Sequence, residues 1–244
     1  MRILSLHPAA TELLFALGAG GHIVGRCDNC TYPESALTIP SIGDAQEVTA
    51  ESAAILEADL IVLGPDQDAL AERLVALTPI TLRFASLDGS LAEIGSLAKM
   101  LGKDVEAEVL SHDLRTLFER IKEKAARFHT TRVYAESLRA TSSISPLMND
   151  LIVLAGGTPY AGPINIDEIK RFDPQMIVIA IPGDESEFDP TLIAARDGWS
   201  DLAAVKNERV FAIDDALLLR PGPRIAQGVK QLAKILHGIT VNGN

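Results

Sequence analysis

The chain has 244 residues, 47% of them apolar, and carries a formal net charge of −11 at pH 7. At roughly 150 residues per domain this length allows one large domain or two smaller lobes. The negative field disfavours nucleic acid as a partner, and no apolar run is long enough to cross a bilayer.

The first predicted element is a strand at residues 3–6, which follows Met1 and Arg2 directly. This start leaves no room for the apolar segment and the small-residue cleavage site of a signal peptide. The sequence therefore predicts either a cytoplasmic protein or the mature form of an exported one.

Two segments resemble each other: residues 49–64 read TAESAAILEADLIVLG, and residues 165–180 read NIDEIKRFDPQMIVIA. Each opens with a helix-capping residue type and has an acid two residues later. A short helix is expected next, and then a strand without polar alternation, as in parallel strands buried on both faces. Segments that begin at Arg2 and Arg132 each read as strand, loop and helix ended by glycine. These repeats predict an α/β fold of two Rossmann-like lobes.

Helical patterns lie between the two predicted lobes. Residues 90–101 form one helix, and an apolar stripe from Val105 to Phe128 indicates a second. The second helix would be about 37 Å long at 1.5 Å per residue, long enough to join two lobes as a rigid strut or to serve as a packing helix. We expect an N-terminal α/β lobe at 1–88, connecting helices at 89–129 and a C-terminal α/β lobe at 130–244.

The sequence has no phosphate-binding loop, no G-x-S-x-G elbow and no H-E-x-x-H motif. In parallel α/β lobes, ligands bind beyond the carboxyl ends of the strands, so the polar residues of those loops are candidate ligand contacts. These are His7, Asp28, Asn29, Asp44, Gln46, Asp66, Glu136, Arg139, Asp214, Arg220 and Arg224. No nucleophile is paired with a base at a recognisable spacing, which favours a binding cleft over an enzyme. We predict no catalytic residue, no intrinsic cofactor and no bound structural metal.

Several of these residues have a second interpretation. His7 could reach a metal centre or form a hydrogen bond in the cleft wall, and Asp214 could contact ligand or complete a turn. Arg220 and Arg224 could brace the last helix. A zinc- or manganese-type receptor that uses His7, Glu136 and Asp214 is an alternative, and an enzyme that uses the cysteine pair is another. Trp199 is expected to fill the core of the second lobe.

The only two cysteines, Cys27 and Cys30, have C-x-x-C spacing. The nearby Pro33 and the lack of an apolar helical stripe favour a loop over the helix N-terminus of a thioredoxin-like pair. A zinc site normally needs four ligands, and only Asp28 and His7 could complete one here. The pair is therefore two small residues on the cleft rim, a reversible disulfide or part of a metal site.

The opening RILSLHPAATELLFALG resembles the R-I-x-S-L-x-P-x-x-T-E-x-x-x-A-L-G pattern of the cobalamin-binding family. These proteins are substrate-binding proteins of ABC transporters, in a group that also binds iron-siderophores and haem. The resemblance runs from Arg2 to about Leu236. Further matching segments are Val24–Pro33, Asp59–Val62, Trp199–Val210 and Arg220–Arg224.

The resemblance implies a class III periplasmic-binding-protein fold, with two lobes joined by a long helix and a cobalamin-type corrinoid or related metal chelate held between them. It implies a monomer that delivers ligand to an ABC permease from a periplasmic or other extracytoplasmic location. Without a signal peptide, a cytoplasmic chelate-binding protein with no transport role is the alternative.

Two positions lack the aromatic residues of the family, and three acids match its docking positions. Asn29 stands where the cobalamin binder has a cleft tyrosine, and Ala45 where it has a cleft tryptophan. Because flat apolar surface holds a macrocycle, these losses favour a smaller or more polar chelate. Acids at the lobe tips of the family pair with permease arginines, which implies docking roles for Asp68, Glu185 and Glu187.

Overall fold

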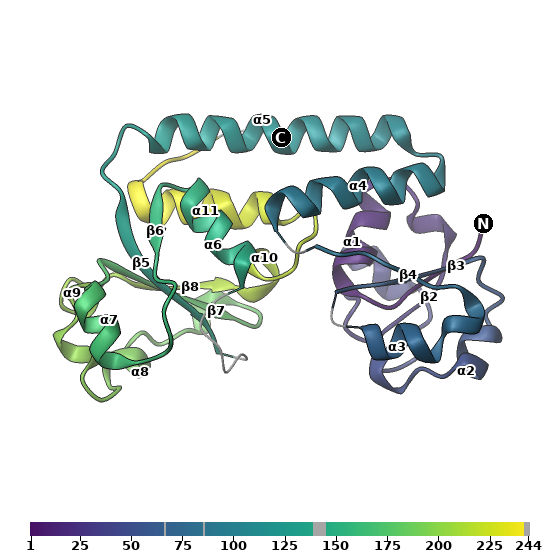
Figure 1. Cartoon of the computed structure of the whole chain (residues 1–244), viewed down its shortest axis with the longest axis horizontal. Helices are drawn as coiled ribbons and strands as arrows, with labels where there is room; N and C mark the ends of the chain where they lie inside the picture. Colours follow the sequence, from purple (N-terminus) through teal and green to yellow (C-terminus); the bar gives the residue numbers. More distant parts are fainter. Residues whose placement is uncertain (66, 85, 139–144, 242–244) are drawn as a thin grey trace. The chain divides into compact units, whose positions relative to one another are not determined.

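The computed structural model describes residues 1–65, 67–84, 86–138 and 145–241. The chain forms two compact units: the first is Met1–Asp113 with Pro221–Pro223, and the second is Leu114–Arg220 with Arg224–Asn244. Their boundary falls inside the long helix α5 (Asp104–Ala125), which confirms the second of the predicted helices (Figure 1). In the described part of the chain, no helix is both long and apolar enough to cross a membrane.

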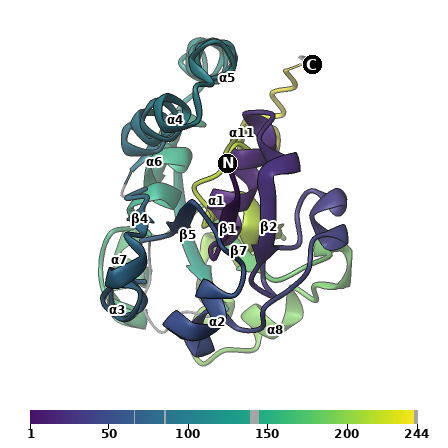
Figure 2. The same cartoon turned by 90° about the vertical axis from the view of Figure 1, so that its right-hand side faces the viewer.

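The first unit contains a parallel sheet with strand order β2-β1-β3-β4. In Figures 1 and 2, α1 and α4 lie on one side of this sheet, and α2 and α3 lie on the other. The strands are β1 (Ile3–Ser5), β2 (Ile23–Arg26), β3 (Leu60–Leu63) and β4 (Ile80–Thr81). The helices are α1 (Pro8–Ala16), α2 (Ala50–Ala54), α3 (Asp68–Arg73) and α4 (Leu87–Leu101). Short 3-10 turns are η1 (Gly20–His22), η2 (Glu34–Thr38), η3 (Ala45–Glu47) and η4 (Val75–Leu77).

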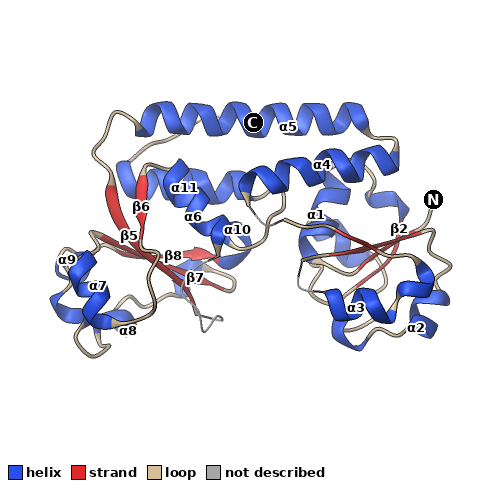
Figure 3. Cartoon of the chain, viewed as in Figure 1, coloured by secondary structure: helices blue, strands red, loops and turns tan. Residues whose placement is uncertain are grey.

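The second unit repeats this plan with strand order β6-β5-β7-β8, again all parallel. Figure 3 shows its strands with α6, α10 and α11 on one side and α7, α8 and α9 on the other. The strands are β5 (Thr131–Ser137), β6 (Gly157–Pro159), β7 (Met176–Ile181) and β8 (Val210–Asp214). The helices are α6 (Pro146–Leu154), α7 (Ile166–Phe172), α8 (Thr191–Ala194), α9 (Ala203–Lys206), α10 (Asp215–Leu218) and α11 (Ile225–His237). Two 3-10 turns are η5 (Glu185–Glu187) and η6 (Trp199–Asp201).

The two predicted helix–strand repeats are present, and local sequence explains their starts. Thr49 and Ser52 exchange hydrogen bonds in a capping box at the start of α2. Asn165 caps α7 by accepting from the backbone N–H groups of Asp167 and Glu168. The strands that follow, β3 and β7, are buried along their whole length, as strands covered on both faces must be.

The core of the second unit includes an aromatic cluster that confirms the prediction for Trp199. This side chain is 5% exposed, and its ring packs edge-on against Tyr134 at a centroid distance of 5.2 Å. The guanidinium of Arg196 lies 4.8 Å from the centre of the indole ring. Trp199 thus joins apolar packing to a cation–π contact.

We predict that Ile61→Ala in β3 lowers the free energy of unfolding of the first unit by about 2–5 kcal/mol, because it removes a core side chain that is 1% exposed. Ile55→Ala is the matched control: Ile55 is 79% exposed, so its change should stay within about 0.5 kcal/mol. Urea unfolding followed by circular dichroism measures both. Equal losses in the two variants would contradict the placement of β3 in the core.

Candidate functional site

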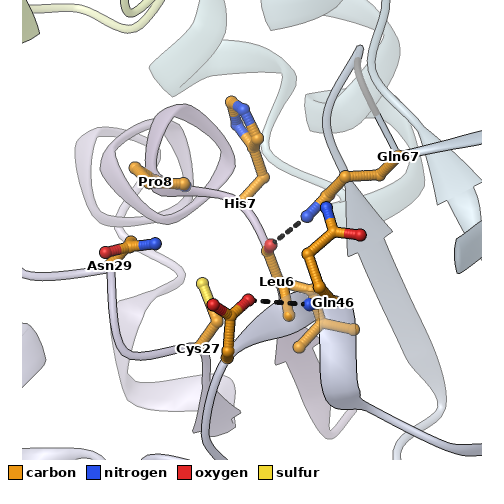
Figure 4. A pocket seen from close by; sticks show the side chains of 9 residues that line it. Leu6, His7, Pro8, Cys27, Asn29, Gln46 and Gln67 are labelled. Atoms are coloured by element: carbon orange, nitrogen blue, oxygen red, sulfur yellow. Dashed lines mark hydrogen bonds between the residues drawn. The ribbon is translucent and has the colours of Figure 1, made fainter. Parts of the chain in front are cut away.

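A cavity of about 310 Å³ lies at the carboxyl edge of the first unit's sheet, where the chain leaves β1, β2 and β3. It brings together four of the predicted ligand contacts, which are His7, Asn29, Asp44 and Gln46. In Figure 4, Asn29 stands on one side of the cavity, and Gln46 and Gln67 stand on the other. The full lining is Leu6, His7, Pro8, Cys27, Asn29, Asp44, Ala45, Gln46 and Gln67.

His7 occupies the N-cap position of α1, and its Nδ1 accepts a hydrogen bond from the backbone N–H of Ala9 at 3.2 Å. Pro8 follows at the first helical position, where a missing N–H costs nothing. The imidazole packs on Gly64, since a Cβ built there would lie 2.2 Å from the ring. The orientation of His7 is therefore set by a cap on one side and a glycine on the other.

Gln67 fixes the backbone that forms the cavity floor. Its side-chain Nε2 donates to the carbonyl of Leu6 at 2.7 Å, and its Oε1 accepts from the N–H of Gly64 at 2.8 Å. Leu6 follows β1 and Gly64 follows β3, so one amide joins the ends of two neighbouring strands. At 7% exposure this side chain satisfies backbone groups that water cannot easily reach. It was missed as a site residue; its only signal was its place in the loop after a buried strand.

The loop that carries Asp44 and Gln46 is braced locally. The Asp44 carboxylate accepts from the Gln46 N–H at 2.8 Å, and Arg73 Nη2 donates to the Gln46 carbonyl at 2.7 Å. Ala45 is buried between them and lines the cavity. The loop thus holds a carboxylate and an amide at the cavity with little freedom of the backbone.

The C-x-x-C segment forms a turn, as predicted, with the N–H of Cys30 donating to the carbonyl of Cys27 at 3.1 Å. Both cysteines are free and buried, and their Sγ atoms lie 3.0 Å apart. Arg26 supports the turn by donating to the carbonyls of Cys27 and Asp28. Cys27 lines the cavity, although it was not among the predicted ligand contacts.

Asp28, another predicted contact of the first unit, is not part of the cavity lining. Asp28 is exposed, and its carboxylate accepts from the Ser41 hydroxyl. Asp66, like Arg139 of the second unit, falls outside the described residues.

In the second unit, the buried carboxylate of Glu136 is engaged by its own neighbours. It accepts from the Tyr134 hydroxyl at 2.7 Å and forms an ion pair with Arg196 at 2.6 Å. Burial, together with the hydrogen bond to this carboxylate, raises the pKa of Tyr134, so the phenol keeps its proton and donates it. Arg196 was not predicted, because its pairing depends on tertiary contact between distant segments.

The remaining predicted contacts lie at or near the starts of α10 and α11. Asp214 caps α10 by accepting from the N–H of Ala216 at 3.0 Å, which is the turn chemistry weighed for it. Arg224 occupies the N-cap position of α11 without a side-chain capping bond, and Arg220 is half-buried in the segment before it. Neither arginine lines the cavity of the first unit.

The predicted docking acids are exposed but differ in their contacts. Asp68 binds Arg83 through both carboxylate oxygens, at 2.7 and 3.3 Å. Glu185 accepts from Gln231 at 3.4 Å, and Glu187 lies in the same 3-10 turn.

The described residues contain no group of three His, Cys, Asp or Glu side chains that could hold a metal ion. The cavity can instead offer amides, a carboxylate, an imidazole and a thiol to a small molecule.

The family model for periplasmic binding proteins matches residues 3–217, so the chain belongs to this family. The uncharacterized ABC transporter substrate-binding lipoprotein YvrC of Bacillus subtilis is 26% identical, over 97% of this chain and 80% of that protein. The vitamin B12-binding protein of Vibrio cholerae is 24% identical, over 96% of this chain and 88% of that protein. The structure of the periplasmic heme-binding protein RhuT from Roseiflexus has a TM-score of 0.82 and 25% identity, and the match covers 97% of this chain and 98% of that one. These matches confirm the predicted family and its two-lobe α/β fold.

We predict that Gln67→Glu destabilises the first unit by about 1–3 kcal/mol at neutral pH, because a carboxylate oxygen then faces the Leu6 carbonyl. The same repulsion raises the pKa of the introduced carboxyl in the folded protein above its ordinary value of about 4.3. In acid, the protonated carboxyl donates to Leu6, so the free energy of unfolding of the Gln67→Glu variant should approach that of wild type. This free energy should fall as the pH rises through the raised pKa.

Urea unfolding at a series of pH values measures this profile. Gln46→Glu is the matched control, since Gln46 is exposed and its side chain holds no strand ends together. Identical pH profiles for the two variants would show that the Gln67 amide does not bind the two backbone groups.

Proposed function

We propose that this protein is the substrate-binding component of an ABC importer and that its ligand is a metal chelate of the corrinoid, haem or iron-chelate class. The observation that carries the proposal is the polar cavity at the carboxyl edge of a parallel sheet, in a chain of the periplasmic binding protein family. The names of the similar proteins, which include vitamin B12-binding and heme-binding members, support the ligand class. The proposed role is binding, without chemistry on the ligand.

The size of the cavity limits how such a ligand is held. Ligand pockets measure roughly 300–1,000 Å³, and this cavity of about 310 Å³ is at the lower end. A macrocycle is too large to enter it whole. We propose that the cavity receives one polar edge or side group of the chelate, while other surfaces of the protein cover the rest.

The lining favours a chelate with a polar rim. Asn29 and Ala45, where the resemblance implies missing aromatics, both line this cavity. Asn29, Asp44 and Gln46 offer hydrogen bonds there, and Ala45 offers no flat apolar surface. A cobalamin-type corrinoid is our first candidate because of the family and the vitamin B12-binding relative, and a smaller or more polar chelate is the alternative that this lining favours.

The proposed location is extracytoplasmic, where an importer's binding protein collects its ligand. The proposed partner is the importer's permease, with Asp68, Glu185 and Glu187 as docking acids. Like charges on the acidic chain would keep copies apart and favour a monomer in solution.

Ligand binding is tested with hydroxocobalamin, haemin and a ferric siderophore. Each is incubated with the protein, and the visible spectrum is read after desalting. We expect one of them to stay bound at one molecule per chain. Loss of all three on desalting, with no heat of binding in calorimetry, would contradict the proposal.

Asn29→Ala should weaken binding of the retained chelate about tenfold, because one hydrogen bond to a ligand is worth on the order of 1.4 kcal/mol. Asn207→Ala is the matched control: Asn207 is an exposed amide of the second unit that donates to its own helix at Ala203. Equal affinities of the two variants would remove Asn29 from the site.

The docking proposal predicts opposite effects at one ion pair. Asp68→Lys should weaken association with the permease, because it reverses a docking charge. Arg83→Ala should strengthen it, because Arg83 occupies the carboxylate that a permease arginine would have to reach. Both effects should shrink as salt screens exposed charges. Binding to permease in lipid nanodiscs measures them, and an Arg83→Ala variant that binds more weakly than wild type would contradict the role of Asp68.

A further inference from the structure

We propose that Cys27 and Cys30 form a redox-active dithiol, which closes to an intramolecular disulfide in the wall of the cavity. The proposal does not depend on the identity of the ligand. It rests on the geometry of the turn, on the access that the cavity gives, and on the charges around the two sulfurs.

The turn already places the two sulfurs almost in bonding position. Their Sγ atoms lie 3.0 Å apart as free thiols, and a disulfide bond measures about 2.05 Å. The backbone bond from the N–H of Cys30 to the carbonyl of Cys27 holds the turn closed. A movement of about 1 Å by the side chains would therefore close the bond without unfolding the segment.

The cavity distinguishes this pair from inert buried cysteines. Most buried cysteines do not react because no reagent reaches them. Cys27 lines the cavity, whereas Cys30 lies deeper, where its Sγ is 3.7 Å from the carbonyl oxygen of Ser5. Cys27 is 1% exposed and Cys30 0%, so a small oxidant that enters the cavity meets Cys27 first, and Cys30 can act as the resolving thiol.

The surroundings favour one thiolate in the pair. The pKa of Cys30 is lowered, first by the hydrogen bond with the Cys27 thiol and then by Thr11, a backbone N–H and the positive charge of Arg26. The same hydrogen bond, burial and the neighbouring negative charge raise the pKa of Cys27. The first proton is therefore lost from Cys30, although burial opposes this loss, and the second stays on Cys27. The two sulfurs lie 3.0 Å apart, so this second proton can move from Cys27 to Cys30 and leave the charge on Cys27.

Hydrogen peroxide can oxidise the dithiol to a disulfide in two steps. The shared proton first moves to Cys30, and the Cys27 thiolate attacks one peroxide oxygen, so that an S–O bond forms and the O–O bond breaks. The departing hydroxide takes the proton from Cys30 and leaves as water. The Cys30 sulfur then attacks the sulfenic acid, so that the S–S bond forms, the S–O bond breaks and a second water leaves. Hydrogen peroxide is reduced by two electrons, and the dithiol is oxidised by two. A small dithiol reverses the change by thiol–disulfide exchange.

The test treats the native, full-length protein with hydrogen peroxide, then with an alkylating reagent in denaturant, and measures intact mass. We expect loss of the mass of two hydrogen atoms, no alkylation, no covalent dimer, and full recovery of two alkylatable thiols after dithiothreitol. Native protein that keeps both thiols, or that forms only intermolecular disulfides, would overturn the proposal.

Two variants test the order of attack. In Cys30→Ser the resolving thiol is gone, so Cys27 should accumulate as a sulfenic acid that dimedone traps. In Cys27→Ser the remaining thiol is screened from the cavity and should trap several-fold less dimedone. Equal trapping in the two variants would overturn the assignment of Cys27 as the attacking sulfur. The wild-type mass measurement decides the disulfide itself even if a variant fails to fold.

Discussion

A single buried amide holds together the strand ends on which the candidate site depends. Gln67 binds the carbonyl that follows β1 and the N–H that follows β3, and these two backbone groups would otherwise be buried without partners. Because Gly64 is fixed in this way, its bare Cα offers the surface on which the His7 ring packs. The Gln67 side chain therefore supports both the His7 cap of α1 and the backbone beside the cavity. Gln67 therefore helps to set the shape of the candidate site.

The two units share a topology but treat their carboxyl edges differently. In the first unit, amide and carboxylate side chains surround an open cavity. In the second, the buried carboxylate of Glu136 is satisfied by Tyr134 and Arg196, which in turn packs on Trp199. A charge already paired and desolvated has little left to offer a ligand, and breaking such a pair is costly. Among the described residues, the polar side chains at this edge of the first unit line a cavity, whereas Glu136 at the edge of the second is paired within its own unit.

The fold could be predicted because its signals are local. Apolar runs such as Leu60–Leu63 have few options other than a buried parallel strand, and Thr49 and Asn165 cap helices through bonds that span only a few residues. The site was predicted only in part. The rule that ligands bind beyond strand ends gave His7, Asn29, Asp44 and Gln46, which the structure brings to one cavity.

The same rule could not separate residues that line the cavity from residues whose polar groups already bind other side chains. Asp28 is bound by Ser41, and Glu136 by Arg196, a partner far away in the sequence. Which polar side chain finds a partner depends on tertiary contacts that no spacing encodes, and Gln67 was overlooked for the same reason. In this chain, the hydrogen-bond partners therefore say more about which side chains are available at the cavity than loop position alone.

The most direct test of this account is a crystal structure of the protein with the chelate that survives desalting. We expect the chelate to place a polar group in the cavity of the first unit, within hydrogen-bond distance of Asn29, Asp44 or Gln46. The Gln67 bonds to the strand ends should remain in place. A chelate bound with that cavity empty, or held by the second unit alone, would contradict the account.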